Sequence, residues 1–119
     1  MKVAIIGSGP LGIEAAVHFL SKNANVVLFS ANGPGGAVRR LGQDFPDLLM
    51  SYSWSGLTST LGRNFINNEV FLSKESPTCL DYFEKYLLPI FQKLEQLNLV
   101  RKVCVKRVQK QSLELEDEI

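Results

Sequence analysis

The stretch VAIIGSGPLGIEAA, residues 3–16, carries the clearest indication of a fold in this chain. Its first four residues are apolar and a glycine follows them, which is typical of a central strand that is covered on both faces and ends in a tight turn. From Pro10 to about Lys22, apolar residues recur on one side of a predicted helix. The run NVVLFS, residues 25–30, then reads as a second buried strand. We therefore predict a βαβ unit over residues 2–30, with parallel strands and a right-handed crossover.

The turn between the first strand and the helix has the spacing GxGxxG, with glycines at positions 7, 9 and 12. Gly7 permits the tight turn, Gly9 lets a pyrophosphate approach the backbone, and Gly12 lets the helix pack close to the strand. The N-terminus of the helix would present free N–H groups and the positive end of its dipole to the phosphates. This context, strand before and helix after, favours a dinucleotide site over a glycine turn without a ligand.

The acid that usually accompanies this motif is absent. An Asp or Glu that holds the ribose hydroxyls is expected roughly 20 residues after the glycines, at the end of the second strand. That position holds Ser30, followed by Ala31 and Asn32. Ser30 or Asn32 could bind a ribose without a charge. Without the acid, a 2′-phosphate is no longer repelled, and Arg39 and Arg40 follow within a short loop. NADP(H) is thus an alternative ligand, while a solvated helix face is the alternative role for the two arginines.

Composition and charge exclude several classes of function. The 119 residues suffice for one domain or a part of one, and 13 basic against 12 acidic residues leave a net charge of +1. We therefore expect no nucleic-acid partner. The apolar run at residues 3–7 is too short to cross a membrane, and the N-terminus is unlike a secretory signal. Cys79 and Cys104 are isolated, so we expect no disulfide, no metal site and a cytoplasmic location.

The rest of the chain divides into two parts. Residues 31–75 are rich in Gly, Ser and Asn and are interpreted as an irregular insertion, with short helices around 37–41 and 57–66. Residues 76–119 are interpreted as a helix and strand region. The helix is expected to begin with Ser76 as N-cap and Pro77 in its first turn, and to be kinked by Pro89. A third strand is expected in LVRKVCVKRVQK, residues 99–110, and the start of another in SLELEDEI, residues 112–119.

These motifs resemble the N-terminus of the two-dinucleotide-binding-domain flavoproteins, the FAD-dependent oxidoreductases that include glutathione-reductase-like enzymes and flavin monooxygenases. VAIIGSGPLGIEAA is similar to the family's opening FAD motif, and GPGGAVRR, residues 33–40, is similar to its double-glycine segment. The segments YFEKYLLPIFQKL and VRKVCVKRVQK resemble the helix and strand that precede the family's β-meander. The placement of the glycine motif at residue 7 favours FAD over NAD(P)H.

The resemblance implies a role for several residues. Gly7, Gly9 and Gly12 would line the FAD pyrophosphate, and Gly35 and Gly36 would lie near the cofactor as it extends toward the flavin. The backbones of three further residues would contribute to the pyrophosphate site: Ser8, Pro10 and Leu11. Ser30 stands where the ribose-binding acid belongs. The family also uses a late Gly-Asp motif and an NAD(P)H domain, so we expect a fragment that lacks its C-terminal half and gives no turnover alone.

The sequence therefore predicts an α/β chain with an incomplete, Rossmann-like, three-layer parallel sheet. The leading hypothesis is the FAD-binding module of a flavin-dependent oxidoreductase that works with NAD(P)H. The first alternative is an NADP(H)-binding domain that uses Arg39 or Arg40. The second is a degenerate nucleotide-binding fold kept for protein association, because the exposed sheet edge of an incomplete domain favours homo-oligomers.

Overall fold

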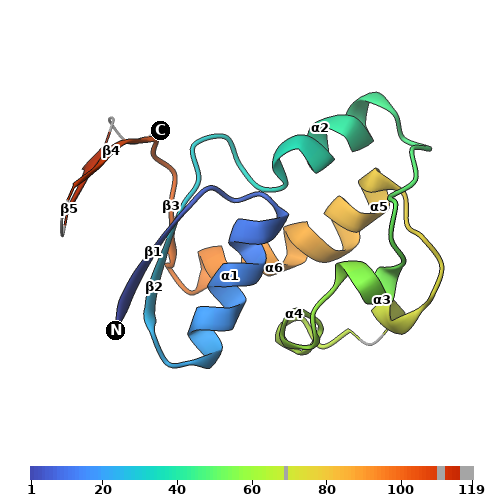
Figure 1. The fold of residues 1–119 in the computed structure, drawn as a ribbon, viewed down its shortest axis with the longest axis horizontal. Helices are drawn as coiled ribbons and strands as arrows, with labels where there is room; N and C mark the ends of the chain where they lie inside the picture. The colour runs from blue at the N-terminus through green and yellow to red at the C-terminus, as the bar shows by residue number, and fades with distance from the viewer. Residues whose placement is uncertain (69, 110–111, 116–119) are drawn as a thin grey trace.

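The computed structural model describes residues 1–68, 70–109 and 112–115, and it has an α/β fold. Three parallel strands form one sheet in the order β1-β2-β3, and a separate antiparallel pair, β4 and β5, follows (Figure 1). The strands are β1 (Lys2–Ile6), β2 (Asn25–Phe29), β3 (Val100–Arg101), β4 (Val105–Gln109) and β5 (Ser112–Leu115). The helices are α1 (Pro10–Ser21), α2 (Gly36–Asp44), α3 (Trp54–Leu57), α4 (Thr60–Phe65), η1 (Val70–Leu72), α5 (Cys79–Tyr82), η2 (Phe83–Leu87) and α6 (Leu88–Gln96).

The predicted βαβ unit is confirmed in its elements and in the parallel pairing of its strands. Strand β1 pairs in parallel with β2, so that Val3 lies opposite Val26 and Ile5 opposite Leu28. Helix α1 connects them and buries its apolar side in the core, at Ile13, Ala16 and Val17. Burial of this stripe is the main contribution that the helix makes to the core, because each apolar side chain removed from water stabilises the fold.

The expectation that β1 is covered on both faces is wrong for the described residues. Ile5 is buried, but its neighbours alternate with it, so Ala4 is exposed and Ile6 is 52% exposed. Figure 1 shows the helices gathered on one side of the sheet. In the part of the chain that the structure describes, β1 is an edge strand, and the third layer of the prediction is absent. Because the helices cover only one face of the sheet, only those side chains of β1 that point to that face are buried.

The segment 31–75, which we interpret from its sequence as an irregular insertion, contains several short helices. Both expected short helices are present, one as α2 and the other as α3 and α4 in succession. Serine side chains cap the last two. The hydroxyl of Ser53 accepts the amide proton of Gly56 at 3.3 Å, and that of Ser59 accepts the amide proton of Gly62 at 2.8 Å. These caps satisfy amide groups that a helix leaves without partners at its start.

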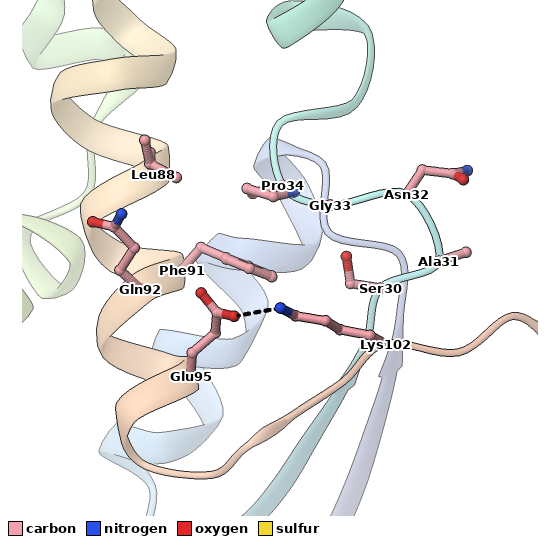
Figure 2. Close-up of a pocket in the computed structure, with 10 residues that line it drawn as sticks. All are labelled: Ser30, Ala31, Asn32, Gly33, Pro34, Leu88, Phe91, Gln92, Glu95 and Lys102. Carbon is pink, nitrogen blue, oxygen red and sulfur yellow. Dashed lines mark ion pairs between the residues drawn. The ribbon is translucent and has the colours of Figure 1, made fainter. Parts of the chain in front are cut away.

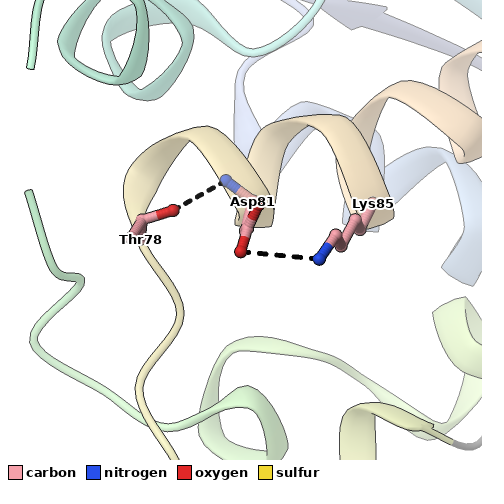
Figure 3. A network of polar contacts seen from close by, with 3 residues as sticks. All are labelled: Thr78, Asp81 and Lys85. Atoms are coloured by element: carbon pink, nitrogen blue, oxygen red, sulfur yellow. Dashed lines mark hydrogen bonds and ion pairs between the residues drawn. The ribbon is translucent and has the colours of Figure 1, made fainter. Parts of the chain in front are cut away.

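The long C-terminal helix begins two residues later than its sequence predicts. Thr78, not Ser76, is the N-cap: its hydroxyl accepts the amide proton of Asp81 at 3.0 Å (Figure 3). Asp81 also pairs with Lys85 at 3.5 Å, one turn along. The helix runs through α5, η2 and α6, and Pro89, where we expect a kink from the sequence, lies in the first turn of α6 directly after the π-helical turn η2. Because proline has no N–H and its ring clashes with the preceding turn, a widened turn accommodates it.

The expected strand at residues 99–110 is wrong in its extent. Only Val100 and Arg101 join the parallel sheet, opposite Leu28 and Phe29. Residues 105–109 instead form β4, which pairs with β5 in an antiparallel hairpin. The strand expected from residue 112 is confirmed as β5 up to residue 115, and the remainder of that prediction lies outside the described residues.

A buried tyrosine joins three helical segments in the core. The hydroxyl of Tyr86 donates a hydrogen bond to the carboxylate of Glu14 on α1, and it accepts the amide proton of Ser59, ahead of α4, at 3.1 Å. Its ring stacks on Tyr82 with 5.7 Å between centroids. Burial, followed by the hydrogen bond to Glu14, raises the pKa of Tyr86 well above its ordinary value. This contact holds α1, and with it the glycine turn, against the C-terminal helix.

Candidate functional site

Of the three glycines in the turn between β1 and α1, Gly12 is crowded, whereas a Cβ at Gly7 or Gly9 would meet no atom within 4 Å. Gly7 has a φ of +103°, a conformation that glycine adopts without strain, and its amide donates to the carbonyl of Phe29 at 2.9 Å. A Cβ at position 12 would lie 2.0 Å from the carbonyl oxygen of Gly7, so Gly12 allows the close approach of helix and turn. A Cβ at Gly9 would meet no atom within 4 Å. Gly9 therefore presents its backbone to open space.

A second glycine-rich loop, residues 33–36, lies against the first. The amide of Gly35 donates to the carbonyl oxygen of Ser8 at 2.9 Å, and a Cβ at Gly36 would lie 3.6 Å from the Cα of Gly9. Gly35 and Gly36 have φ values of +95° and +53°. The structure thus brings together the two glycine segments that the sequence singled out separately, and the absence of side chains lets their backbones approach.

Two helices begin at this junction. The N-caps are Gly9 for α1 and Gly35 for α2, and neither helix has a side-chain cap or an acidic residue in its first turn. The starts of both helices, with their positive dipole ends, lie at this junction, and a helix start without caps or acids favours an anion. Pro10 occupies the first position of α1, where its missing N–H costs nothing. Leu11 follows with its side chain 85% exposed.

The side chain of Ser30 is hydrogen-bonded to the glycine turn. Its hydroxyl lies 2.6 Å from that of Ser8, which in turn donates to the carbonyl of Gly33 at 2.8 Å. Because the one hydroxyl proton of Ser8 is used on Gly33, Ser30 is the donor of the 2.6 Å hydrogen bond. Ser30 is 1% exposed and Ser8 is 6% exposed. The side chain at the predicted ribose position therefore connects the two loops and uses its single donor there.

A cavity of about 480 Å³ lies beside this junction (Figure 2). It opens at the carboxyl ends of β2 and β3, where ligands bind in open α/β sheets. Its charged groups are Glu95 of α6 and Lys102, paired at 3.1 Å. The lining residues are Ser30, Ala31, Asn32, Gly33, Pro34, Leu88, Phe91, Gln92, Glu95 and Lys102.

Half of that lining was missed by sequence reasoning. The four lining residues of the C-terminal helix recur at spacings of three and four, which places them on one face, but nothing local indicates which loop this face meets. Lys102 follows β3, and its position depends on the pairing of β3 with β2.

The two arginines lie in different environments. Arg40 is exposed and does not line the cavity. Arg39 is half-buried, and its Nε is buried without a hydrogen-bond partner among the described residues. Its Nη1 would lie 2.8 Å from a Cβ on Gly33, so the guanidinium is next to the loop that follows β2. Of the predicted pair, Arg39 alone is near the glycine junction.

Comparisons with protein families, curated proteins and solved structures reveal no match to this chain. In the part of the chain that the structure describes, no group of three or more His, Cys, Asp or Glu residues is arranged to hold a metal ion. No helix of the same part has the length and apolar character needed to cross a bilayer. The features of the described residues that bear on function are the glycine junction and the adjacent cavity.

Proposed function

We propose that this chain is a Rossmann-like dinucleotide-binding module and that its ligand is FAD. The observation that carries the proposal is the open backbone of Gly9 between two helix starts that have neither side-chain caps nor acids. A pyrophosphate needs close access to backbone amides and a positive potential, and this junction offers both. The hydroxyls of Ser8 and Ser30 keep the two loops together, so the site is preorganised in the folded chain.

The arrangement of elements supports the same proposal. A pyrophosphate at Gly9 would lie at the carboxyl end of β1, and the cavity at the carboxyl ends of β2 and β3 is next to it. In dinucleotide-binding sheets, the nucleotide extends from the first strand across these ends. The proposed chemistry is that of a flavin-dependent oxidoreductase in which FAD supplies the redox reaction. In this proposal, the residues of the glycine junction bind and orient the cofactor.

Calorimetric titration of the purified chain with FAD tests the proposal. We expect a micromolar dissociation constant for the unmodified chain and weaker binding by Gly9→Ala, because the added methyl group occupies the space next to the pyrophosphate. Since a Cβ at Gly9 contacts nothing, this variant should fold normally, and its loss of binding reports on the site. Equal binding by the two proteins would contradict the assignment of Gly9.

One observation favours a second candidate, NADP(H). The buried Nε of Arg39 has no hydrogen-bond partner among the described residues, and an arginine near this loop is suited to a 2′-phosphate. Under this alternative, Arg39→Ala weakens NADPH binding and leaves FAD binding nearly unchanged. Arg40→Ala is the matched control, because Arg40 is exposed and does not line the cavity.

A chain that binds neither nucleotide would support the third candidate, protein association. The exposed edge of β1 is the surface that favours this outcome, because its backbone groups and the side chain of Ile6 are accessible to another molecule. Sedimentation of the same sample decides the point: a dimer without nucleotide binding supports association, and a monomer argues against it.

A further inference from the structure

We propose that Glu95 supplies the carboxylate that binds the ribose hydroxyls of the nucleotide, in place of the acid that the end of β2 lacks. The inference depends on the proposed dinucleotide site and adds to it a residue and a ligand class. The ligand is a nucleotide whose ribose keeps its free 2′,3′-diol, and a 2′-phosphorylated nucleotide is disfavoured.

The cavity is adjacent to the glycine turn. Ser30 and Gly33 line it, and these same two residues are hydrogen-bonded to Ser8 in the glycine turn. A nucleotide with its pyrophosphate at Gly9 therefore has this cavity as the adjacent space for its ribose. Figure 2 shows Glu95 on the helix side of the cavity, with its carboxylate directed toward the strand side, where Ser30 and Lys102 lie.

Ser30 cannot replace the missing acid. Its hydroxyl is 1% exposed and its proton is used on Ser8. Ribose hydroxyls are donors that bind most strongly to an ionised acceptor. Glu95 is the one carboxylate among the residues that line this cavity. The fold thus places a carboxylate at the cavity, although Glu95 comes 65 positions after Ser30, where the sequence motif is expected to have its acid.

The carboxylate of Glu95 remains able to accept hydrogen bonds from a ligand. Glu95 pairs with Lys102 at 3.1 Å, and the two side chains are 32% and 63% exposed. An ion pair this accessible to water is weak, so a ligand can share or displace it. A carboxylate has about four acceptor positions, which leaves room for both ribose hydroxyls beside the ammonium group. Lys102 holds the carboxylate at the cavity before the ligand arrives.

The charge of Glu95 also determines which ribose is accepted. A carboxylate at this place repels a 2′-phosphate, whereas Lys102 without its partner would attract one. Removal of Glu95 should therefore do two things together. The affinity gained from a 2′-hydroxyl on the nucleotide should disappear, and the affinity for a nucleotide that carries a 2′-phosphate should increase. A purely structural role for Glu95 would change all ligands alike.

The test measures the affinity of the full chain for ADP, 2′-deoxy-ADP and adenosine 2′,5′-bisphosphate from backbone amide shifts in NMR spectra. The unmodified chain should bind ADP about tenfold more tightly than 2′-deoxy-ADP, the effect of one hydrogen bond to a charged acceptor. Glu95→Ala should lose this preference and bind the 2′-phosphorylated ligand more tightly than the unmodified chain does. Glu84→Ala is the matched control, because Glu84 is an exposed acid of the same long helix and does not line the cavity.

Each outcome supports or contradicts the role proposed for Glu95. If Glu95→Ala keeps the preference for ADP, the role of Glu95 is wrong while the dinucleotide site stands. If ADP causes no shift at Gly9 in the unmodified chain, the proposed function fails and the inference fails with it. Should Glu95→Ala fold poorly, Glu95→Gln keeps the shape of the side chain without its charge. That variant should show a reduced preference for ADP and weaker exclusion of the 2′-phosphate, and unchanged values would overturn the proposal.

Discussion

Gly12 packs against Gly7 so closely that a Cβ at position 12 would lie 2.0 Å from the carbonyl oxygen of Gly7. That oxygen belongs to the backbone and cannot rotate away as a side chain would. We expect Gly12→Ala to lower the free energy of unfolding by about 1–3 kcal/mol, the range for overpacking a close contact. Urea denaturation measures the change. Gly9→Ala is the control and should alter stability by less than about 0.5 kcal/mol, because its Cβ contacts nothing. Equal losses in the two variants would contradict the crowding at Gly12.

Restoring an acid at the end of β2 should destabilise the chain. Ser30→Asp places a carboxylate in a site that is 1% exposed and beside the hydroxyl of Ser8. One hydroxyl cannot replace the hydration of a buried charge. An unsatisfied neutral group typically lowers the free energy of unfolding by about 1–3 kcal/mol, and we expect Ser30→Asp to lower it by roughly twice as much. Thermal unfolding followed by circular dichroism measures it. Asn32→Asp introduces the same group at an exposed position on the same cavity and should be nearly neutral. A stable Ser30→Asp protein would show that the junction opens to water.

Gly62 and Tyr86 are coupled by a second close contact. A Cβ at Gly62 would lie 2.0 Å from the hydroxyl oxygen of Tyr86 and 2.9 Å from the ring carbon that carries it. Gly62→Ala should therefore cost about 1–3 kcal/mol. In the Tyr86→Phe background the same substitution should cost less, because the nearest atom is gone while the ring remains. A double-mutant cycle in urea measures the difference.

The control for this cycle is Gly56→Ala, where the nearest atoms to a Cβ lie 3.6 Å away. Gly56 lies in a helix, and alanine there should be neutral or stabilising by up to about 1 kcal/mol. Additive effects of Gly62→Ala and Tyr86→Phe would disprove the coupling.

Alkaline pH should destabilise the chain through its two stacked tyrosines. Burial, followed by the charges of Tyr86 and Glu14, raises the pKa of Tyr82, and burial with the hydrogen bond to Glu14 raises that of Tyr86. The folded state thus holds these protons more tightly than the unfolded state, in which tyrosine has a pKa of about 10. Their contribution to stability is complete below about pH 10 and is lost as the pH rises above it. Urea midpoints measured between about pH 9 and pH 11 should fall only above about pH 10, and the fall should be shallower in Tyr86→Phe. An unchanged slope in that variant would exclude Tyr86 as a cause.

The parts of the fold that the sequence predicts well are those governed by neighbours in the chain. The βαβ unit follows from local apolar periodicity, and both strands and α1 have nearly the expected bounds. The N-cap was missed by two residues because Ser76 and Thr78 both satisfy the same local rule, and only the structure shows which hydroxyl accepts an amide proton. The strand at residues 99–110 was extended too far, since strand pairing depends on a partner that lies elsewhere in the chain.

The residues of the candidate site also fall into those that local sequence predicts and those that only the fold brings together. Its glycines at positions 7, 9 and 12 could be assigned from spacing alone, because a tight turn, a close approach and helix packing each require a residue without a side chain. The second glycine segment was identified by resemblance, but its contact with Ser8 required the structure. The arginine pair could not be separated in the sequence, where the two residues are adjacent, whereas the fold half-buries Arg39 and exposes Arg40.

The glycine turn, the strand and helix on either side of it, and the lack of an acid at position 30 all follow from the order of residues in the chain. What the lack of an acid means depends on the folded chain, which buries Ser30 against Ser8 and brings Glu95 and Lys102 to the cavity beside them. This difference comes from the range of the interactions. Backbone conformation and helix starts depend on a few consecutive residues, whereas a cavity is built where distant segments pack on a common core, and no local pattern specifies that meeting.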